Sequence, residues 1–168
     1  MPAKANALKI SRHFTESGKD PFDKLSWSKR DVEIRNFDGT IAFSMKGVTL
    51  PDNYSQVAAN VLAQKYLRKA GIPKKLRNVK EKAVPSWLQK SVPDLKSMEN
   101  LPENEKFGEE IDGKQTFRRL AGTWTYWGWK HGYFASEDDA RSYFDEMSYM
   151  LASQMVSPNS PQWFNTGL

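Results

Sequence analysis

The chain has 168 residues and a formal net charge of +5, from 25 Lys or Arg against 20 Asp or Glu. That length is sufficient for one domain with a buried core, and the aromatic content of 12%, with six Trp, argues against disorder. The sequence has no Cys and only two His, which excludes disulfides, zinc–thiolate centres, iron–sulfur clusters and thiol chemistry carried by this chain alone.

The N-terminal stretch MPAKANALKISRHF is polar and lacks the apolar segment of a secretory signal. We expect the first twenty residues to be loosely held unless a partner fixes them. No window of the sequence approaches the roughly 18 consecutive apolar residues of a membrane helix. These features predict a cytoplasmic protein with no membrane span.

The stretch DVEIRNFDGTIAFSMKGVTLP predicts a β-hairpin with one buried face. Val32 and Ile34 alternate with polar residues before the turn NFDG, and Ile41 and Phe43 resume the alternation after it. Pro51 is expected to end the second strand.

The stretch NYSQVAANVLAQKYLRKAGIP predicts a helix that begins after Ser55, its N-cap. Lys69 suits the last turn, and Gly71 and Pro73 are expected to end the helix. The predicted apolar stripe is Val57, Ala58, Val61, Leu62 and Tyr66.

From about residue 74 to 114, prolines and charges replace any periodic pattern, and Trp87, Leu88 and Leu95 are expected to anchor an irregular segment. Residues 60–100 hold ten Lys or Arg against three Asp or Glu. This basic region suits either nucleic acid or a solvated face beside a partner. The second interpretation is favoured because no nucleic-acid recognition motif accompanies the charge.

The next stretch, QTFRRLAGTWTYWGWKHGYF, has helical spacing at Phe117, Leu120, Ala121 and Trp124 before an aromatic run. Those aromatics could stack bases, with Lys130 on the phosphates. Alternatively they fill a core or an interface, which we favour because no alternating strands present them on one face.

The stretch SEDDARSYFDEMSYMLASQMVSP predicts a second helix, with Ser136 and Asp139 forming a capping box. Three acids in its first turn are explained by the helix dipole, so they do not indicate a metal site. Pro158 prevents continuation. The predicted buried stripe is Ala140, Tyr143, Phe144, Met147 and Leu151.

The last stretch, SPNSPQWFNTGL, reads locally as an ordinary turn that could hold a hydroxyl and backbone N–H groups toward an anion. PNSPQWFNTGL also resembles the loop and strand start near the substrate site of ribonucleotide reductase large subunits, most closely the adenosylcobalamin-dependent class II. The stretches RHFTESGKDPFDKLSW, SQVAANVLAQKYLRKAGIP, RLAGTWTYWGWKHGYF and SEDDARSYFDEMSYMLASQM are similar to the same family, in the same order.

The resemblance implies a mixed α/β fold, with an N-terminal β-hairpin and helical layer plus the start of a ten-stranded α/β barrel. We expect an arm and hairpin over residues 1–51, and a helical region over 52–168 that leads into the first barrel strand. In the family, adenosylcobalamin generates a cysteine thiyl radical that drives reduction of a ribonucleotide to a deoxyribonucleotide. This chain lacks the catalytic cysteines, so we expect it to be inactive alone.

The resemblance also implies the site residues. Ser160 matches a serine that contacts the substrate nucleotide, and its neighbours Asn159 and Gln162 are further candidates. No catalytic, cofactor-binding or metal-binding residue is expected in this chain. Trp163–Leu168 should begin a strand whose neighbours lie on another polypeptide.

The expected partners are therefore the remaining catalytic portion of the reductase on another chain, the ribonucleotide substrate, and an oligomer of the complete enzyme. A gene split or a truncation would explain such an arrangement. Two alternatives stay open at this point. One is a nucleic-acid-binding module that uses Lys65 to Lys90 and the Trp cluster, and the other is a purely structural assembly subunit.

Overall fold

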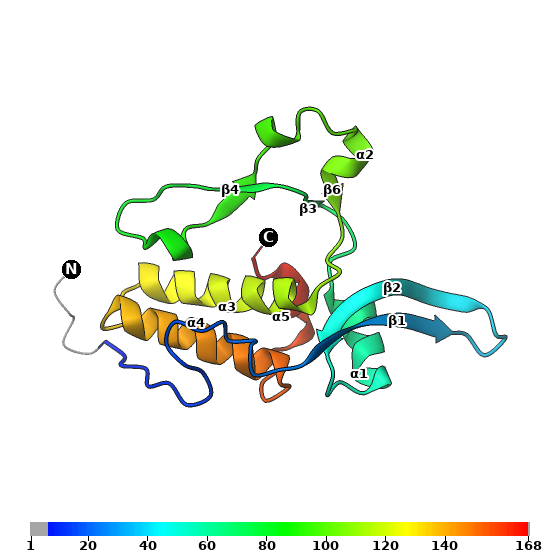
Figure 1. Cartoon of the computed structure of the whole chain (residues 1–168), viewed down its shortest axis with the longest axis horizontal. Helices are drawn as coiled ribbons and strands as arrows, with labels where there is room; N and C mark the ends of the chain where they lie inside the picture. Colours follow the sequence, from blue (N-terminus) through cyan, green and yellow to red (C-terminus); the bar gives the residue numbers. More distant parts are fainter. Residues whose placement is uncertain (1–6, 168) are drawn as a thin grey trace.

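The computed structural model describes residues 7–167, which form a mixed α/β unit built around two long helices (Figure 1). Helix α3 (Gly113–Lys130) packs along α4 (Glu137–Ala152). A long β-hairpin projects at one end, and an irregular lobe made of residues 72–109 lies over α3 (Figure 1). None of the helices in this part of the chain is long and apolar enough to cross a bilayer.

The strands of residues 7–167 form three two-stranded antiparallel sheets and no barrel. The pairs are β1 (Trp27–Arg35) with β2 (Ile41–Pro51), β3 (Ile72–Pro73) with β6 (Phe107–Gly108), and β4 (Leu76–Asn78) with β5 (Ser91–Pro93). The shorter helical elements are α1 (Gln56–Val61), the π-helix η1 (Leu62–Tyr66), the 3₁₀ turns η2 (Ser86–Leu88) and η3 (Lys96–Met98), α2 (Glu103–Lys106) and α5 (Ser160–Asn165).

The predicted hairpin is confirmed, and its second strand ends at Pro51. Val32 pairs with Met45, and both side chains are buried. The turn closes with the N–H of Asn36 donating to the carbonyl of Thr40 at 2.9 Å. Gly39 has φ +85°, a left-handed conformation that a glycine adopts without steric cost.

The helix after the hairpin begins as predicted, because the Ser55 hydroxyl accepts from the N–H of Ala58 at 3.1 Å. Its predicted apolar stripe is confirmed in part: Leu62 is buried, and Ala58 and Tyr66 pack against the core. Val57 is 72% and Val61 43% exposed, whereas Ala59 is fully buried. The helix also ends earlier than predicted. The N–H of Leu67 donates to the carbonyl of Leu62, so the last turn is a π-turn that ends before Lys69.

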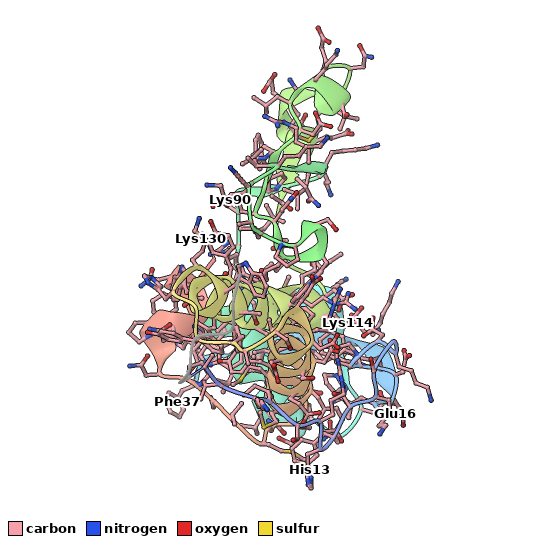
Figure 2. All side chains as sticks on the ribbon, turned by 90° about the vertical axis from the view of Figure 1, so that its left-hand side faces the viewer. His13, Glu16, Phe37, Lys90, Lys114 and Lys130 are labelled. Atoms are coloured by element: carbon pink, nitrogen blue, oxygen red, sulfur yellow. The ribbon has the colours of Figure 1, made fainter. Side chains whose placement is uncertain are left out.

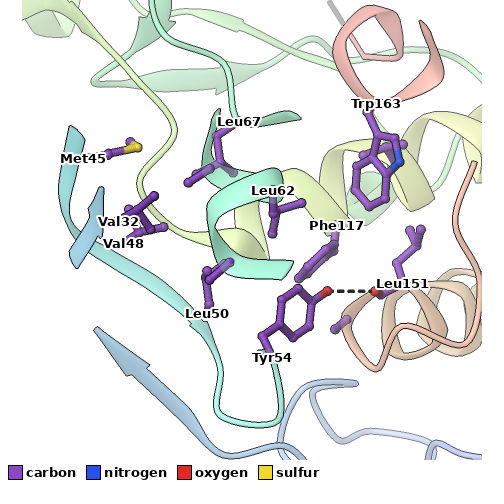
Figure 3. Close-up of a cluster of buried hydrophobic side chains, with 14 of the residues drawn as sticks. Val32, Met45, Val48, Leu50, Tyr54, Leu62, Leu67, Phe117, Leu151 and Trp163 are labelled. Carbon is purple, nitrogen blue, oxygen red and sulfur yellow. Dashed lines mark hydrogen bonds between the residues drawn. The ribbon is translucent and has the colours of Figure 1, made fainter. Parts of the chain in front are cut away.

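The core lies between the hairpin, α1, η1 and the two long helices (Figure 3). The phenol of Tyr54 lies at its centre and donates to the carbonyl of Leu151 at 3.4 Å. The buried cluster comprises Phe22, Val32, Met45, Val48, Leu50, Tyr54, Ala59, Leu62, Ala63, Leu67, Phe117, Leu120, Ala121, Leu151, Ala152 and Trp163.

The aromatic run of α3 continues a single helix, in which Trp124 packs against the core, whereas Tyr126 and Trp129 contact the lobe. Tyr126 donates to a Glu81 carboxylate oxygen at 2.7 Å, and the Trp129 indole donates to the carbonyl of Ala83 at 2.7 Å. A Cβ at Gly128 would lie 2.7 Å from the Phe134 ring, so the glycine lets the next loop fold back on the helix.

The lobe is irregular, as predicted, and two of its three predicted anchors are confirmed. Leu88 is buried, and the Trp87 ring lies 3.8 Å from the guanidinium of Arg141. Leu95 is 61% exposed, so it is not an anchor. Lys90 and Lys130 lie near the junction of the lobe and the helices (Figure 2), where Lys130 forms an ion pair with Glu81.

The N-terminal arm, residues 7–26, binds along α4, so the expectation of a loosely held arm is wrong for this part; residues 1–6 lie outside the described residues. The N–H of Ile10 donates to Asp139 at 2.7 Å, and the N–H groups of Phe14 and Thr15 donate to Glu146 at 3.1 and 2.8 Å. Helix α4 is therefore covered on two sides. This explains why Glu146, which lies outside the predicted buried stripe, is also buried.

Candidate functional site

The segment that carries the candidate substrate residues is a short helix, α5, and not the strand predicted over Trp163–Leu168. Asn159 is extended and precedes the helix, and Pro161 lies in its first turn, where a missing N–H costs no helical hydrogen bond. The expectation of a first barrel strand is therefore wrong through Gly167, and Leu168 lies outside the described residues.

Trp163 anchors α5 to the core. Its side chain is 4% exposed, and its ring stacks on Tyr66 with centroids 5.1 Å apart and an interplanar angle of 18°. The ring of Phe117 meets it edge-on at 6.2 Å (Figure 3 shows both residues). The indole N–H also donates to the carbonyl of Pro158 at 3.1 Å, which fixes the turn before the helix.

Two arginines hold the other end of α5. Arg119 donates from Nη1 to the carbonyls of Trp163 at 2.9 Å and Thr166 at 2.7 Å. Arg68 donates to the carbonyls of Thr166 and Gly167 at 3.3 and 3.1 Å. The Trp163 carbonyl belongs to the last turn of the helix, and those of Thr166 and Gly167 follow it. Carbonyls at a helix C-terminus lack helical partners, so the guanidinium groups act as a C-terminal cap.

Glu110 balances this positive charge. Its carboxylate is 3% exposed and accepts two hydrogen bonds from Arg119, from Nε at 2.7 Å and from Nη2 at 2.9 Å. It also accepts from the Thr116 hydroxyl at 2.9 Å and from the N–H of Arg68 at 3.0 Å. A fork of this kind is the strongest geometry for an arginine–carboxylate pair. We call Glu110, Arg119 and Arg68 the buried charge cluster.

Burial alone would raise the pKa of Glu110, but the hydrogen bonds and the charge of Arg119 outweigh it, and the pKa lies below the usual glutamate range. The pKa of Glu146 is also lowered: burial opposes the shift, and the hydrogen bonds from Thr15 and Phe14 prevail. Burial raises the pKa of Asp145, although its ion pair with Arg12 acts in the opposite direction.

The lowered pKa of Glu110 predicts a loss of stability in acid. Its contribution is fully present above the unfolded glutamate pKa of about 4.3, and it is lost as the pH falls through the lower folded value. Replacing Glu110 with Gln removes this contribution. We expect the difference in urea midpoint between wild type and Glu110→Gln to be largest at neutral pH and to shrink steadily below about pH 4.3. A difference independent of pH would contradict this.

Ser160 lies at the surface, at the first position of α5, with its hydroxyl 3.1 Å from the Tyr66 hydroxyl. Asn159 and Gln162 are exposed beside it. The Gln162 side-chain oxygen accepts from the Thr166 hydroxyl at 2.7 Å, so it is already engaged within the helix. The three predicted site residues therefore occur on one exposed segment whose buried side is anchored by Trp163 and the buried charge cluster.

Sequence reasoning missed the supports of this segment. Tyr66 was predicted to lie in the stripe of the preceding helix, and Arg68, Glu110 and Arg119 were assigned no role. The one available signal was Arg119 itself, a charged residue between the apolar positions Phe117 and Leu120 of the same helix. Nothing in the sequence identified Glu110 as its partner.

Among the open hollows of residues 7–167, two have volumes of about 500 and 590 Å³. Lys69, Glu103 and Phe107 line the smaller one, and charged groups of the arm and α4 line the larger. A cobalamin needs a site with extensive apolar walls, and these hollows do not fit it. Residues 7–167 contain no group of three or more His, Asp or Glu that could hold a metal ion.

Residues 28–154 match the family model described as class II vitamin B12-dependent ribonucleotide reductase. The chain is 52% identical over 161 residues to the vitamin B12-dependent ribonucleotide reductases of Bradyrhizobium diazoefficiens and Agrobacterium fabrum, with 96% of this chain covered. It is 32% identical over 166 residues to that of Streptomyces avermitilis, with 98% covered. The chain spans 13–14% of the length of these relatives. The chain belongs to the family of class II vitamin B12-dependent ribonucleotide reductases.

Proposed function

We propose that this chain is the N-terminal piece of a ribonucleotide reductase that makes deoxyribonucleotides by radical chemistry. In the complete enzyme adenosylcobalamin would supply the radical. The family match and the relatives named above support this assignment. The chain has no Cys, so the proposal assigns the radical and reducing cysteines to the remaining portion of the reductase, and it takes that portion to be another chain.

Within that enzyme the chain contributes a structural layer and one substrate-binding loop, whose site residues are Asn159, Ser160 and Gln162. The observation that carries this proposal is the arrangement of α5. Its underside is anchored through Trp163 and the buried charge cluster, while Ser160 remains exposed at its start. Rigid support beneath an exposed polar side chain is the arrangement that a binding site requires, because little conformational entropy is lost when a ligand binds.

The partner proposal has a direct test. A tagged copy of this chain is purified from its host, and bound polypeptides are identified by mass spectrometry. Recovery of a longer, cysteine-containing reductase polypeptide that restores adenosylcobalamin-dependent reduction of CDP or CTP is expected. Recovery of nucleic acid in its place, with binding that weakens steeply as salt is added, would contradict the proposal and favour a nucleic-acid-binding module.

Replacing Ser160 with Ala tests the substrate role. In the complete enzyme we expect the Kd for the substrate nucleotide to rise about 10- to 150-fold, since a hydrogen bond to a charged group contributes about 1.5–3 kcal/mol. The thermal midpoint should not change, because the side chain is exposed. Ser157→Ala is the matched control: Ser157 is an exposed serine of the same loop that lies outside the proposed site. Equal nucleotide affinity in wild type and Ser160→Ala would rule out the role of Ser160.

A further inference from the structure

Tyr66 meets the candidate substrate residue directly. It is the last residue of the π-helix η1, far from α5 in sequence, and its hydroxyl lies 3.1 Å from the Ser160 hydroxyl. Its ring stacks on Trp163, the residue that anchors α5. One side chain thus contacts both the anchor of α5 and its exposed serine.

The location of Tyr66 is well fixed. The π-turn that ends at Tyr66 has Leu62 and Leu67 on either side, 4% and 3% exposed, so the backbone cannot rotate without disturbing the core. The Lys69 ammonium contacts the carbonyl of Ala63 and satisfies a group that the widened turn leaves free. In addition, a phenol has only two side-chain torsions to order. The hydroxyl of Tyr66 is therefore held at one point in space.

Counting the protons of the two hydroxyls shows which of them must donate the hydrogen bond if Ser160 is to bind a ligand. Each has one proton to donate and two lone pairs. If Ser160 donates to Tyr66, the serine has no proton left for a ligand. If Tyr66 donates to Ser160, the serine proton is free to point outward, and the first hydrogen bond polarises the second. Only the second arrangement leaves Ser160 able to donate to an anionic oxygen.

We infer that Tyr66 is a positioning residue for the substrate. Its phenolic hydroxyl donates a hydrogen bond to Ser160 and thereby directs the serine hydroxyl to donate to an anionic oxygen of the ribonucleotide. This inference rests on the proposed function of Ser160. It assigns to Tyr66 a role that acts through Ser160, with no contact of its own to the nucleotide.

The inference is tested by a double-mutant cycle in the complete enzyme. The variants are Tyr66→Phe, Ser160→Ala and the two combined, and the probes are CDP and CTP. Tyr66→Phe keeps the ring on Trp163 and removes one oxygen. We expect it to raise the Kd and KM of the nucleotide about 2- to 12-fold, with kcat and the thermal midpoint unchanged, since a typical hydrogen bond contributes a net 0.5–1.5 kcal/mol.

The combined variant tests whether Tyr66 acts through Ser160. Because Tyr66 acts through Ser160, Tyr66→Phe should have no further effect once Ser160 is Ala. Tyr126→Phe is the matched control, since it also removes a phenol oxygen but that oxygen binds Glu81 of the lobe. It should leave the nucleotide Kd unchanged.

The outcomes separate this inference from the proposed function. If Ser160→Ala weakens binding but Tyr66→Phe has no effect, or adds its full effect to Ser160→Ala, the role of Tyr66 is overturned and that of Ser160 stands. If Ser160→Ala itself has no effect, the proposed substrate role fails, and the inference about Tyr66 fails with it. A loss of affinity in Tyr126→Phe equal to that in Tyr66→Phe would also overturn the inference.

Discussion

Replacing Arg119 with Ala is expected to lower the free energy of unfolding by about 3–5 kcal/mol, because it leaves a buried carboxylate without its charged partner. The Arg119 side chain is 10% exposed and that of Glu110 3%. The substitution also frees the carbonyls of Trp163 and Thr166 at the end of α5. The effect is therefore both electrostatic and local to the candidate site, and it is measured as the change in urea midpoint followed by tryptophan fluorescence.

Arg118 provides the matched control, since it is the neighbouring arginine on the same helix. Its ion pair with Asp20 has side chains that are 44% and 41% exposed. Exposed pairs of this kind contribute about 0–1 kcal/mol, so Arg118→Ala should change the free energy of unfolding very little. Equal losses in Arg118→Ala and Arg119→Ala would show that the buried charge cluster has no special importance.

Replacing Phe117 with Ala, as a separate single substitution, is also expected to lower the free energy of unfolding by about 3–5 kcal/mol. Phe117 is completely buried, and its ring lies 6.2–6.3 Å from the rings of Phe22, Trp27 and Trp163. Its removal leaves a cavity where the arm, the hairpin and α5 meet on α3. All three should loosen together, which a parallel rise in amide exchange in these segments would detect.

Phe37 is the control for this prediction, because it is a phenylalanine at the hairpin turn that is fully exposed (labelled in Figure 2). Phe37→Ala removes the same side chain from a site without packing neighbours, so stability should change by less than about 0.5 kcal/mol. A large loss in this variant would mean that the hairpin turn has packing partners in the measured state.

Local sequence signals predicted the parts of the fold that depend on local physics. The turn NFDG, the N-cap Ser55 and the capping box at Ser136 are all confirmed, because each involves residues within three or four positions of one another. The helical character of α3 and α4 follows from the same short-range periodicity.

The failures occur where distant segments decide the structure. The stripe predicted for α1 placed Val57 and Val61 against the core, whereas the packing of the helix buries Ala59 and leaves both valines exposed. Trp163 and Phe164 were expected in a strand, whereas Trp163 is buried on α3 and η1 as part of a helix. Both outcomes depend on partners far away in the chain.

The candidate site divides in the same way. Ser160, Asn159 and Gln162 were identified by family resemblance and not by local pattern, and their roles stay a prediction. Their structural supports are long-range: the bonds from Arg68 to the carbonyls of Thr166 and Gly167 span 98 and 99 positions. A single sequence carries no signal for such pairs, because a buried arginine and a solvated one look the same in it.

The docking of the N-terminal arm on α4 implies an order of events during synthesis. The amide of Phe14 is made long before its acceptor, because Glu146 lies 132 residues later. At translation rates of about 5–20 residues per second, the arm waits roughly 7–26 s for that acceptor to be made. Contacts of such sequence separation form late, so the arm, although synthesised well before α4, is among the last segments to reach its native place. Until then the nascent arm is accessible to chaperones and to processing enzymes.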